Sequence, residues 1–402
     1  RACIAEYDKA DKRWTLTLGS QGSHGMRDLI ATYVLKVDPK RIRVVTPDVG
    51  GGFGTKIFLY REYPLAMIAA EKLTRPVRWV ADRNEHFLAD THGRANLATA
   101  TMALDAKGKF IGLKVDLSAE MGAYLSQYGP FIPWVGTTMT PGCYNIPAVH
   151  VRFRGVFTNT TPVDAYRGAG RPEATFQIER VIDKAARELG IDPIEIRRRN
   201  YVTEFPYQTP VAVNYDIGDY NALMDKLIEI ADVAGFPARR EESKARGRLR
   251  GLGISSYIEA CGIAPSNLVG QLGARAGLYE AATVRVNPTG GITVFTGSHS
   301  HGQGHETSFP QVVATMLGID ASTIEISHGD TAKVPFGMGT YGSRSLAVGG
   351  SAIVKAVDKI IAKAKKIAAH LMEAAETDIE LKDGRFSVAG TDKSVAWADV
   401  TL

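Results

Sequence analysis

The chain has 402 residues, of which 45% are hydrophobic and 23% charged, with a formal net charge of +5 at pH 7. This is the composition of a globular protein, which excludes a disordered or fibrous chain, and the length suffices for two or three domains. The positive charge is spread along the chain except at residues 239–250, which carry no aromatic side chains to stack on bases, so no nucleic-acid partner is expected.

The cysteine content indicates a reducing compartment. Cys3, Cys143 and Cys261 lie far apart in the sequence and can form neither a disulfide framework nor a CxxC metal site. The sequence has no run of 18 apolar residues, and no signal-peptide pattern opens it. We therefore expect a cytoplasmic protein with no membrane partner and, since the first residue is not Met, a fragment of a longer chain.

Strand and helix patterns alternate along the first part of the chain. A hairpin pattern around 14–18 is followed by a glycine-rich turn and a helix near 26–35. Apolar residues recur at steps of three and four between 173 and 189, which predicts an amphipathic helix ending at Gly190, and Asp192-Pro193 then caps a short helix. The other elements predicted here are strands at 42–46, 76–80, 113–117 and 149–156, helices at 64–73 and 219–233, and a loop at 201–215.

The basic stretch suggests a division of the chain. We expect a first domain at 1–235, a basic linker at 236–250 and a second, truncated domain at 251–402. Within the second domain, the apolar face of 350–375 predicts a long helix, Asp383-Gly384 predicts a hairpin, and a further helix is expected near 395.

The second half of the sequence repeats the first. Gln21 to Asp38 and Gln303 to Asp320 have the same length, and in the same register Ile42 corresponds to Ile324 and Asp48 to Asp330. Each copy reads as a glycine-rich turn, an apolar helix, an Asp, a strand and a second glycine-rich loop. The sequence therefore predicts a duplicated α+β unit, whose period is too long for a solenoid.

Four glycine-rich segments occur, at 19–25, 50–54, 297–304 and 337–350. Because glycine permits positive φ and lets backbone amides approach a ligand, four such loops favour one large polar ligand, although each alone can be a turn. Two nucleotide motifs are excluded between Gly50 and Lys56. Thr55 stands both where a dinucleotide fingerprint needs its last glycine and where a P-loop needs the glycine before lysine.

His299, His301 and His305 suggest a metal site, but no Asp, Cys or Glu at ligand spacing completes a set of ligands, although Glu306 is adjacent. Gln303 lies between two glycines, which fits recognition by backbone and amide groups better, because a Gln side chain offers a donor beside an acceptor.

The segment 165–173 places Arg167 and Arg171 on a tight loop before a helix. Arginine can bond an anion with two parallel hydrogen bonds, and the start of a helix adds positive potential. The alternative is a surface salt bridge with Glu173 or Asp164.

Taken in order, these segments resemble the large subunit of the molybdenum hydroxylases, the family of xanthine dehydrogenase, aldehyde oxidase and carbon monoxide dehydrogenase. Gly19-Ser20-Gln21 resembles the turn whose Gln bonds to the oxo group on molybdenum, 50–54 the Gly-Gly-Phe-Gly loop, and 165–171 the Ala-aromatic-Arg-Gly segment. Gly302-Gln303-Gly304-His305 resembles the pterin loop, and Gly342-Ser343-Arg344-Ser345 a later cofactor loop.

The resemblance implies duplicated molybdopterin-binding α/β units of the aldehyde oxidase and xanthine dehydrogenase type. It implies catalytic roles for Gln21 and Arg167. The residues that it implies for cofactor binding are Gln21, Gly52, Phe53, Gly54, Arg167, Gly302, Gln303, Gly304, Gly342, Ser343 and Ser345. No protein ligand to the metal is expected, because in this family the dithiolene sulfurs of the pterin and small inorganic ligands hold the molybdenum.

The implied activity is insertion of a water-derived oxygen into an aldehyde or N-heterocycle with a molybdenum-molybdopterin cofactor in its cytosine dinucleotide form. Electrons would pass to iron-sulfur clusters and FAD. Three scattered cysteines cannot hold such clusters, so an iron-sulfur small subunit and an FAD medium subunit are the expected partners, and the complete complex is expected to form a dimer.

Departures from the family narrow the substrate. The loop form Ala-Tyr-Arg-Gly-Ala-Gly-Arg belongs to the carbon monoxide dehydrogenase-like branch, but Gly168 replaces the Cys of the copper-containing enzymes, which disfavours carbon monoxide. Ile57 and Ala169 replace a Glu and an aromatic residue that bind purines, which disfavours xanthine.

The family's catalytic Glu would lie beyond Leu402, so we expect this chain alone to be inactive. Two alternatives stay open, namely a cofactor-binding or assembly module without catalysis and a His-rich metal-binding protein.

Overall fold

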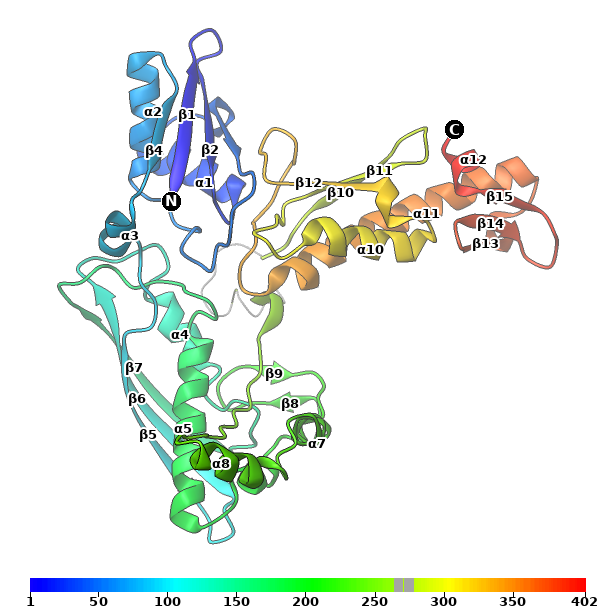
Figure 1. Ribbon diagram of the computed structural model, residues 1–402. Helices are drawn as coiled ribbons and strands as arrows, with labels where there is room; N and C mark the ends of the chain where they lie inside the picture. The colour runs from blue at the N-terminus through cyan, green and yellow to red at the C-terminus, as the bar shows by residue number, and fades with distance from the viewer. Residues whose placement is uncertain (264–269, 271–277) are drawn as a thin grey trace. The chain divides into compact units, whose positions relative to one another are not determined.

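The computed structural model describes residues 1–263, 270 and 278–402. These residues form two compact units (Figure 1). The first unit joins Arg1–Ala89 to Ala260–Leu402, and the second unit is Asp90–Glu259. In the part of the chain that is described, no helix is both long and apolar enough to cross a membrane.

The first unit begins with a four-stranded sheet in the order β3-β2-β1-β4. The strands are β1 (Ala2–Asp8), β2 (Arg13–Leu18), β3 (Ile42–Val45) and β4 (Val77–Val80). The β2–β3 pair is parallel and the other pairs are antiparallel. Helices α1 (Ser23–Leu29), η1 (Ile30–Leu35), α2 (Glu62–Leu73) and α3 (Arg83–Ala89) accompany it. Helix α2 packs on the sheet, where Trp14 Nε1 donates to the Met67 carbonyl at 3.1 Å.

The same unit contains a second sheet in the order β10-β11-β12. Its strands are β10 (Ala282–Val286), β11 (Ile292–Thr296) and β12 (Ile324–Ser327), and its helices are α10 (His305–Leu317) and α11 (Ser351–Met372), preceded by η5 (Ser345–Gly350). Phe309, Val313, Ile353 and Val357 from these helices are almost fully buried in the core beneath the sheet. A small sheet of β13 (Ile379–Lys382), β14 (Arg385–Val388) and β15 (Ser394–Ala396) and helix α12 (Trp397–Thr401) complete this unit.

The duplication predicted from the sequence is confirmed in the order and bounds of the elements. The continuous helix α1–η1 spans 23–35 and α10 spans 305–317, and each is followed by a residue with left-handed backbone, Lys36 and Gly318. Asp38 and Asp320 then cap the short helices η2 (Pro39–Arg41) and η4 (Ala321–Thr323), which lead directly into β3 and β12. The copies differ in that the second half of the first helix is a π-helix.

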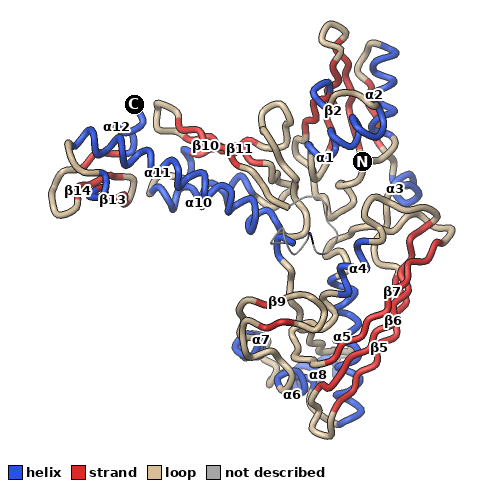
Figure 2. The backbone as a smooth tube through the Cα atoms, turned by 180° about the vertical axis from the view of Figure 1, so that it is seen from behind, coloured by secondary structure: helices blue, strands red, loops and turns tan. Residues whose placement is uncertain are grey.

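The second unit has a three-stranded sheet in the order β5-β6-β7. Its strands are β5 (Asn96–Leu104), β6 (Phe110–Gly122) and β7 (Ala148–Phe157). Figure 2 shows the long helix α5 (Arg171–Leu189) beside this sheet, and Ile178 and Ile182 on that helix are buried in the core. The other elements are α4 (Phe131–Thr137), α6 (Pro193–Arg198), β8 (Tyr207–Gln208), β9 (Asn214–Tyr215), α7 (Tyr220–Ile230) and α8 (Phe236–Ala245), while η3 (Cys261–Ile263) and η6 (Glu376–Asp378) belong to the first unit.

The predicted helices agree with α2, α5, α7 and α11 to within a few residues. Gly190 ends α5 with positive φ, and the Asp192 side chain caps α6, both as predicted.

Helix α8 makes most of the segment 236–250 helical, a feature that the sequence analysis did not predict for the basic linker. Pro237 near its start and the following Ala, Arg, Glu and Lys residues favour helix, which the charge pattern alone did not reveal. The compact units divide the chain elsewhere, since 1–89 and 260–402 pack together. The predicted end of the first family domain at 235 and the predicted start of the second at 251 stay predictions.

Candidate functional site

Three glycine-rich loops of the first unit meet at Gln21, which is 4% exposed. Its Oε1 accepts a hydrogen bond from the Gly54 amide at 2.8 Å, and its Nε2 donates to the Thr340 carbonyl at 3.0 Å. The Thr340 amide donates in return to the Gln21 carbonyl at 2.8 Å. The segments 19–25, 50–54 and 337–350 are therefore held together by one side chain and its own backbone.

The fourth loop, 297–304, is bonded into the same arrangement. The Gly51 amide donates to the His301 carbonyl at 2.8 Å, and Thr340 Oγ1 donates to the His299 carbonyl at 2.9 Å. Ser345 Oγ donates to Thr340 Oγ1 at 2.9 Å. All four segments singled out in the sequence thus converge in one place.

Two glycines in these loops are required by close packing. A Cβ at Gly52 would lie 2.6 Å from Gln21 Cδ, and a Cβ at Gly339 would lie 2.0 Å from the Gln21 carbonyl oxygen. By contrast, Gly302 and Gly304 have φ values of 110° and 79°, and a Cβ at either would meet no atom of the described residues within 4 Å. The first pair therefore packs the loops together, whereas the second pair leaves open backbone that a ligand can approach.

The remaining predicted residues lie around this centre. Phe53 is 55% exposed, with positive φ. Gln303 is exposed, and its Oε1 accepts from the His301 amide. Gly342 and Ser343 both have positive φ, and Ser345 is buried on Thr340.

A buried ion pair that the sequence analysis missed anchors the 337–350 loop. Arg344 and Glu280 have fully buried side chains and bond at 2.8 Å between Nη1 and Oε2. Arg344 also donates from Nη1 to the Gly339 carbonyl at 2.8 Å and from Nη2 to the Tyr279 carbonyl at 2.9 Å. Glu280 precedes a strand and Arg344 stands in a glycine loop, so no local spacing pairs them. Thr340 was missed for the same reason.

The three histidines of the 297–305 segment are buried, with exposed fractions of 1% for His299 and 6% for His301 and His305. The rings of His299 and His301 lie 4.8 Å apart between centroids. Burial, with a smaller contribution from the neighbouring histidine, lowers the pKa of His299 to about 3 and that of His301 to about 4. Burial also lowers the pKa of His305. At neutral pH these imidazoles are uncharged.

The metal hypothesis for these histidines finds no support. Across 1–263, 270 and 278–402, no group of three or more His, Cys, Asp or Glu side chains is placed to hold a metal ion. Glu306, the nearest carboxylate in sequence, accepts from or pairs with His328 Nε2 at 2.8 Å instead.

In the second unit, the Arg167 segment is a strained turn. Gly168, Ala169 and Gly170 all have positive φ, and α5 begins at the next residue. Arg94 Nη2 donates to the Arg167 carbonyl at 2.7 Å. The buried Arg171 donates from Nη1 to the Gly168 carbonyl at 3.1 Å. The loop conformation is therefore fixed by neighbouring arginines.

The two carboxylates considered as salt-bridge partners of Arg167 have other contacts. Glu173 Oε1 pairs with Arg94 Nη1 at 3.3 Å. Asp164 accepts from the Tyr128 amide at 2.8 Å and the Ala165 amide at 2.6 Å, and burial raises its pKa. Both carboxylates thus serve to hold the loop.

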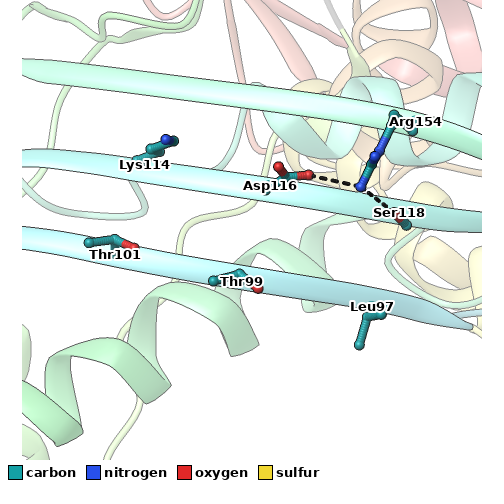
Figure 3. A pocket seen from close by; sticks show the side chains of 7 residues that line it. All are labelled: Leu97, Thr99, Thr101, Lys114, Asp116, Ser118 and Arg154. Carbon is teal, nitrogen blue, oxygen red and sulfur yellow. Dashed lines mark hydrogen bonds and ion pairs between the residues drawn. The ribbon is translucent and has the colours of Figure 1, made fainter.

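A depression lies on the sheet of the second unit (Figure 3). Its polar side chains point outward from β5, β6 and β7, and Arg154 Nη2 bonds Asp116 at 3.4 Å and Ser118 at 3.1 Å. A hydrogen bond from Arg152 holds the pKa of Asp116 below its usual value. Asp116 is thus a paired surface carboxylate.

Comparison with known proteins places this arrangement in a family. Two family models, both described as molybdopterin cofactor-binding domain, match residues 1–201 and 226–402. The chain is 37% identical to the carbon monoxide dehydrogenase large chain of Hydrogenophaga pseudoflava and 36% identical to the nicotine 6-hydroxylase large subunit of Paenarthrobacter nicotinovorans. These matches cover 99% and 100% of this chain and 50% of each relative.

Among solved structures, quinoline 2-oxidoreductase from Pseudomonas putida 86 matches with a TM-score of 0.94 and 36% identity, over 100% of this chain and 51% of that one. The chain belongs to the molybdopterin-binding large subunits of the xanthine dehydrogenase, aldehyde oxidase and carbon monoxide dehydrogenase family. It spans about half the length of the curated relatives it matches.

Proposed function

We propose that this chain is part of a molybdenum hydroxylase large subunit that oxidises an aldehyde or N-heterocycle with oxygen from water. The observation that carries the proposal is the convergence of four glycine loops on Gln21, in a chain of the molybdopterin-binding family. Nicotine 6-hydroxylase and quinoline 2-oxidoreductase are named for N-heterocycles, which favours that substrate class.

The residues around Gln21 fit a large polar cofactor. A Cβ at Gly302 or Gly304 would meet no described atom within 4 Å, and three nearby histidines have buried ring nitrogens without a protein partner among the described residues. When bound, the cofactor supplies the oxidation-reduction chemistry. The chain's own residues would orient it through Gln21, Gln303 and backbone amides. The remaining proposed contacts are Gly52, Phe53, Gly54, Gly302, Gly304, Gly342, Ser343, Ser345 and Arg167.

Catalytic roles are proposed for Gln21 and Arg167. The bonds to Gly54 and Thr340 fix the orientation of the Gln21 carboxamide, and its second N–H and the second lone pair of its oxygen can still contact the cofactor. Arg167 brings a permanent positive charge on a loop whose conformation Arg94 and Arg171 fix, and such a group can stabilise negative charge that develops on a substrate.

The geometry of the Arg167 loop argues against carbon monoxide as substrate. Gly168 has a φ of 94°, and a Cβ there would lie 2.4 Å from Pro172 Cγ. A cysteine at this position, as in the copper-containing enzymes, would therefore require the loop to change shape. Ile57 and Ala169 continue to disfavour a purine.

The finer assignments are also proposals. The cofactor is proposed to be the cytosine dinucleotide form. Partner subunits are proposed to carry iron-sulfur clusters and FAD, since three cysteines cannot hold the clusters, and the complete complex is proposed to be a cytoplasmic dimer.

The test is elemental analysis of the complete complex together with dye reduction by a panel of aldehydes and N-heterocycles. About one molybdenum per large subunit with substrate-dependent dye reduction is expected. A complex without molybdenum would instead support a non-catalytic assembly module, and stoichiometric zinc or copper would support a His-rich metal-binding protein.

A further inference from the structure

The histidines of the 297–305 segment retain hydrogen-bonding capacity that the described chain does not use. The Nε2 atoms of His299 and His301 and the Nδ1 atom of His305 are buried and have no hydrogen-bond partner among the described residues. A buried polar atom without a partner costs about 1–3 kcal/mol. Three such atoms within seven residues indicate that something outside the described chain satisfies them.

Their position identifies the neighbourhood. His301 and His305 flank Gly302-Gln303-Gly304 at the start of the 13-residue helix α10, and the His301 carbonyl accepts from the Gly51 amide. The His299 carbonyl accepts from Thr340, which bonds Gln21. The three imidazoles therefore belong to the place where the four glycine loops converge.

Their uncharged state favours one class of ligand. Burial and the neighbouring histidines lower the pKa of each imidazole, and Lys56 adds to this at His301. A hydrogen bond to the Gln21 backbone opposes the shift at His299, and Glu306, which itself contacts His328, opposes it at His305. Lys56 Nζ is directed to the Val49 carbonyl at 2.5 Å. A neutral imidazole offers one donor and one acceptor, which suits an uncharged polar heterocycle better than a phosphate.

We propose that His299, His301 and His305 form a hydrogen-bonding wall that binds the pterin ring system of the cofactor, rather than its phosphate groups. This inference rests on the proposed function. It assigns to the three histidines a binding role that requires their neutral ring nitrogens and no metal ion.

The first experiment measures hydrogen-deuterium exchange at histidine C2 by mass spectrometry, on the complete complex with cofactor and on the complex from cells that cannot synthesise it. Exchange at the three histidines is expected to be at least about tenfold slower in the loaded form. The control is His24, which is equally buried but donates from Nε2 to the Val334 carbonyl at 3.0 Å, and which should change little.

Three outcomes of the exchange experiment would overturn the proposal. Fast exchange in both forms would show that the cofactor does not contact the histidines. Slow exchange in both forms would show that polypeptide covers them. Protection of the cofactor-free complex by added cytidine diphosphate would assign them to the phosphates. A wild-type complex that contains no molybdenum or pterin at all would contradict the proposed function itself.

The second experiment compares His301→Phe with His301→Gln in the complete complex. Phe keeps the ring volume without a polar atom, whereas the Gln amide can replace a ring nitrogen. Molybdenum and pterin retained after dialysis should fall about fivefold in the Phe variant and recover in the Gln variant, as expected for one hydrogen bond. Unchanged retention in the Phe variant would contradict the proposal. If the Phe variant does not fold, the exchange comparison on the wild-type protein still tests the proposal.

Discussion

Gln21 and Thr340 lie 319 residues apart in the sequence and bond to each other twice. The Gln21 side chain donates to the Thr340 carbonyl at 3.0 Å, and the Thr340 amide donates to the Gln21 carbonyl at 2.8 Å. The same side chain accepts from the Gly54 amide. Gln21 therefore joins a glycine loop of the second half of the duplicated unit to two glycine loops of the first half. The residue proposed to contact the cofactor is therefore also a structural link.

Gln21→Ala should weaken both roles. The change leaves the Gly54 amide and the Thr340 carbonyl without their partner, so unfolding should become easier by about 1–3 kcal/mol, and molybdenum content of the complex should fall. Urea unfolding and elemental analysis would measure the two effects. The control is Gln311→Ala, which removes an exposed side chain from α10. Wild-type stability and metal content in Gln21→Ala would contradict the role assigned to this residue.

Gly339→Ala should destabilise the first unit strongly. Its φ is 90°, and the new Cβ would lie 2.0 Å from the Gln21 carbonyl oxygen, so the 19–25 and 337–350 loops would have to separate. Gly390→Ala is the matched control, because its φ is 75° but its Cβ would meet no atom within 4 Å in the part of the chain that is described. We expect Gly390→Ala to cost about 1 kcal/mol from backbone strain alone, and Gly339→Ala clearly more. Equal melting temperatures for the two variants would show that the loops do not pack as described.

Arg344→Ala should be among the most damaging substitutions in this chain. It leaves the fully buried Glu280 carboxylate without its partner, for which the expected loss of stability is about 3–5 kcal/mol. Arg246→Ala, which removes a pair with Glu242 between side chains that are each more than half exposed, should cost less than about 0.5 kcal/mol. The comparison is made by denaturant unfolding. A loss below about 1 kcal/mol for Arg344→Ala would contradict the anchoring role of this pair.

The stability of the first unit should fall in mild acid. Burial lowers the pKa of His299 to about 3 and that of His301 to about 4, and it lowers that of His305, whereas an unfolded histidine titrates near 6.5. Below about pH 6.5 the unfolded chain therefore binds protons that the folded chain does not. The contribution of these histidines to the free energy of unfolding is fully present above this pH. It decreases as pH falls, by up to about 1.4 kcal/mol per pH unit for each such proton.

Unfolding measured between pH 4.5 and 7.5 on cofactor-free protein, a range of about three units around the histidine pKa, would check this. His301→Phe should make the slope shallower by about one proton. Lys56, Glu306 and His328 also shift the pKa values of these rings. The slopes of the wild type and of His301→Phe are therefore compared with these three residues unchanged. A slope that does not change in His301→Phe would mean that this ring is protonated in the folded chain.

Local signals in the sequence were sufficient to predict much of the fold. The constant register between the two halves appears in the structure as capped short helices at Asp38 and Asp320, each leading into a strand. Helix α5 and its end at Gly190 follow from apolar periodicity and from the freedom of glycine at positive φ. In each case the residues that determine where a helix begins and ends are neighbours in the sequence, so their spacing is sufficient to predict the helix.

The missed features depend on residues that are distant in sequence. Arg344 and Glu280 are 64 positions apart, and only the folded chain brings them together. The glycine loops could be recognised one by one, but their convergence on Gln21 depends on hydrogen bonds between the first and last parts of the chain. Helix α8 was missed because a run of charges was interpreted by its solvation, although the same residues have high helix propensity.

The 402-residue chain by itself should bind no substrate productively and should not turn over. It spans about half the length of its curated relatives, and we propose that the electron relay and the general base lie outside these 402 residues. Absence of a positioned proton acceptor alone costs roughly 10²- to 10⁴-fold in rate. Dye reduction with aldehydes and N-heterocycles, measured on the chain alone and on the complete complex, would decide. Turnover of the chain at the rate of the complex would require a base among the residues present. Glu173 would then be the first to replace, by Gln, because its Oε2 is buried without a hydrogen-bond partner among the described residues.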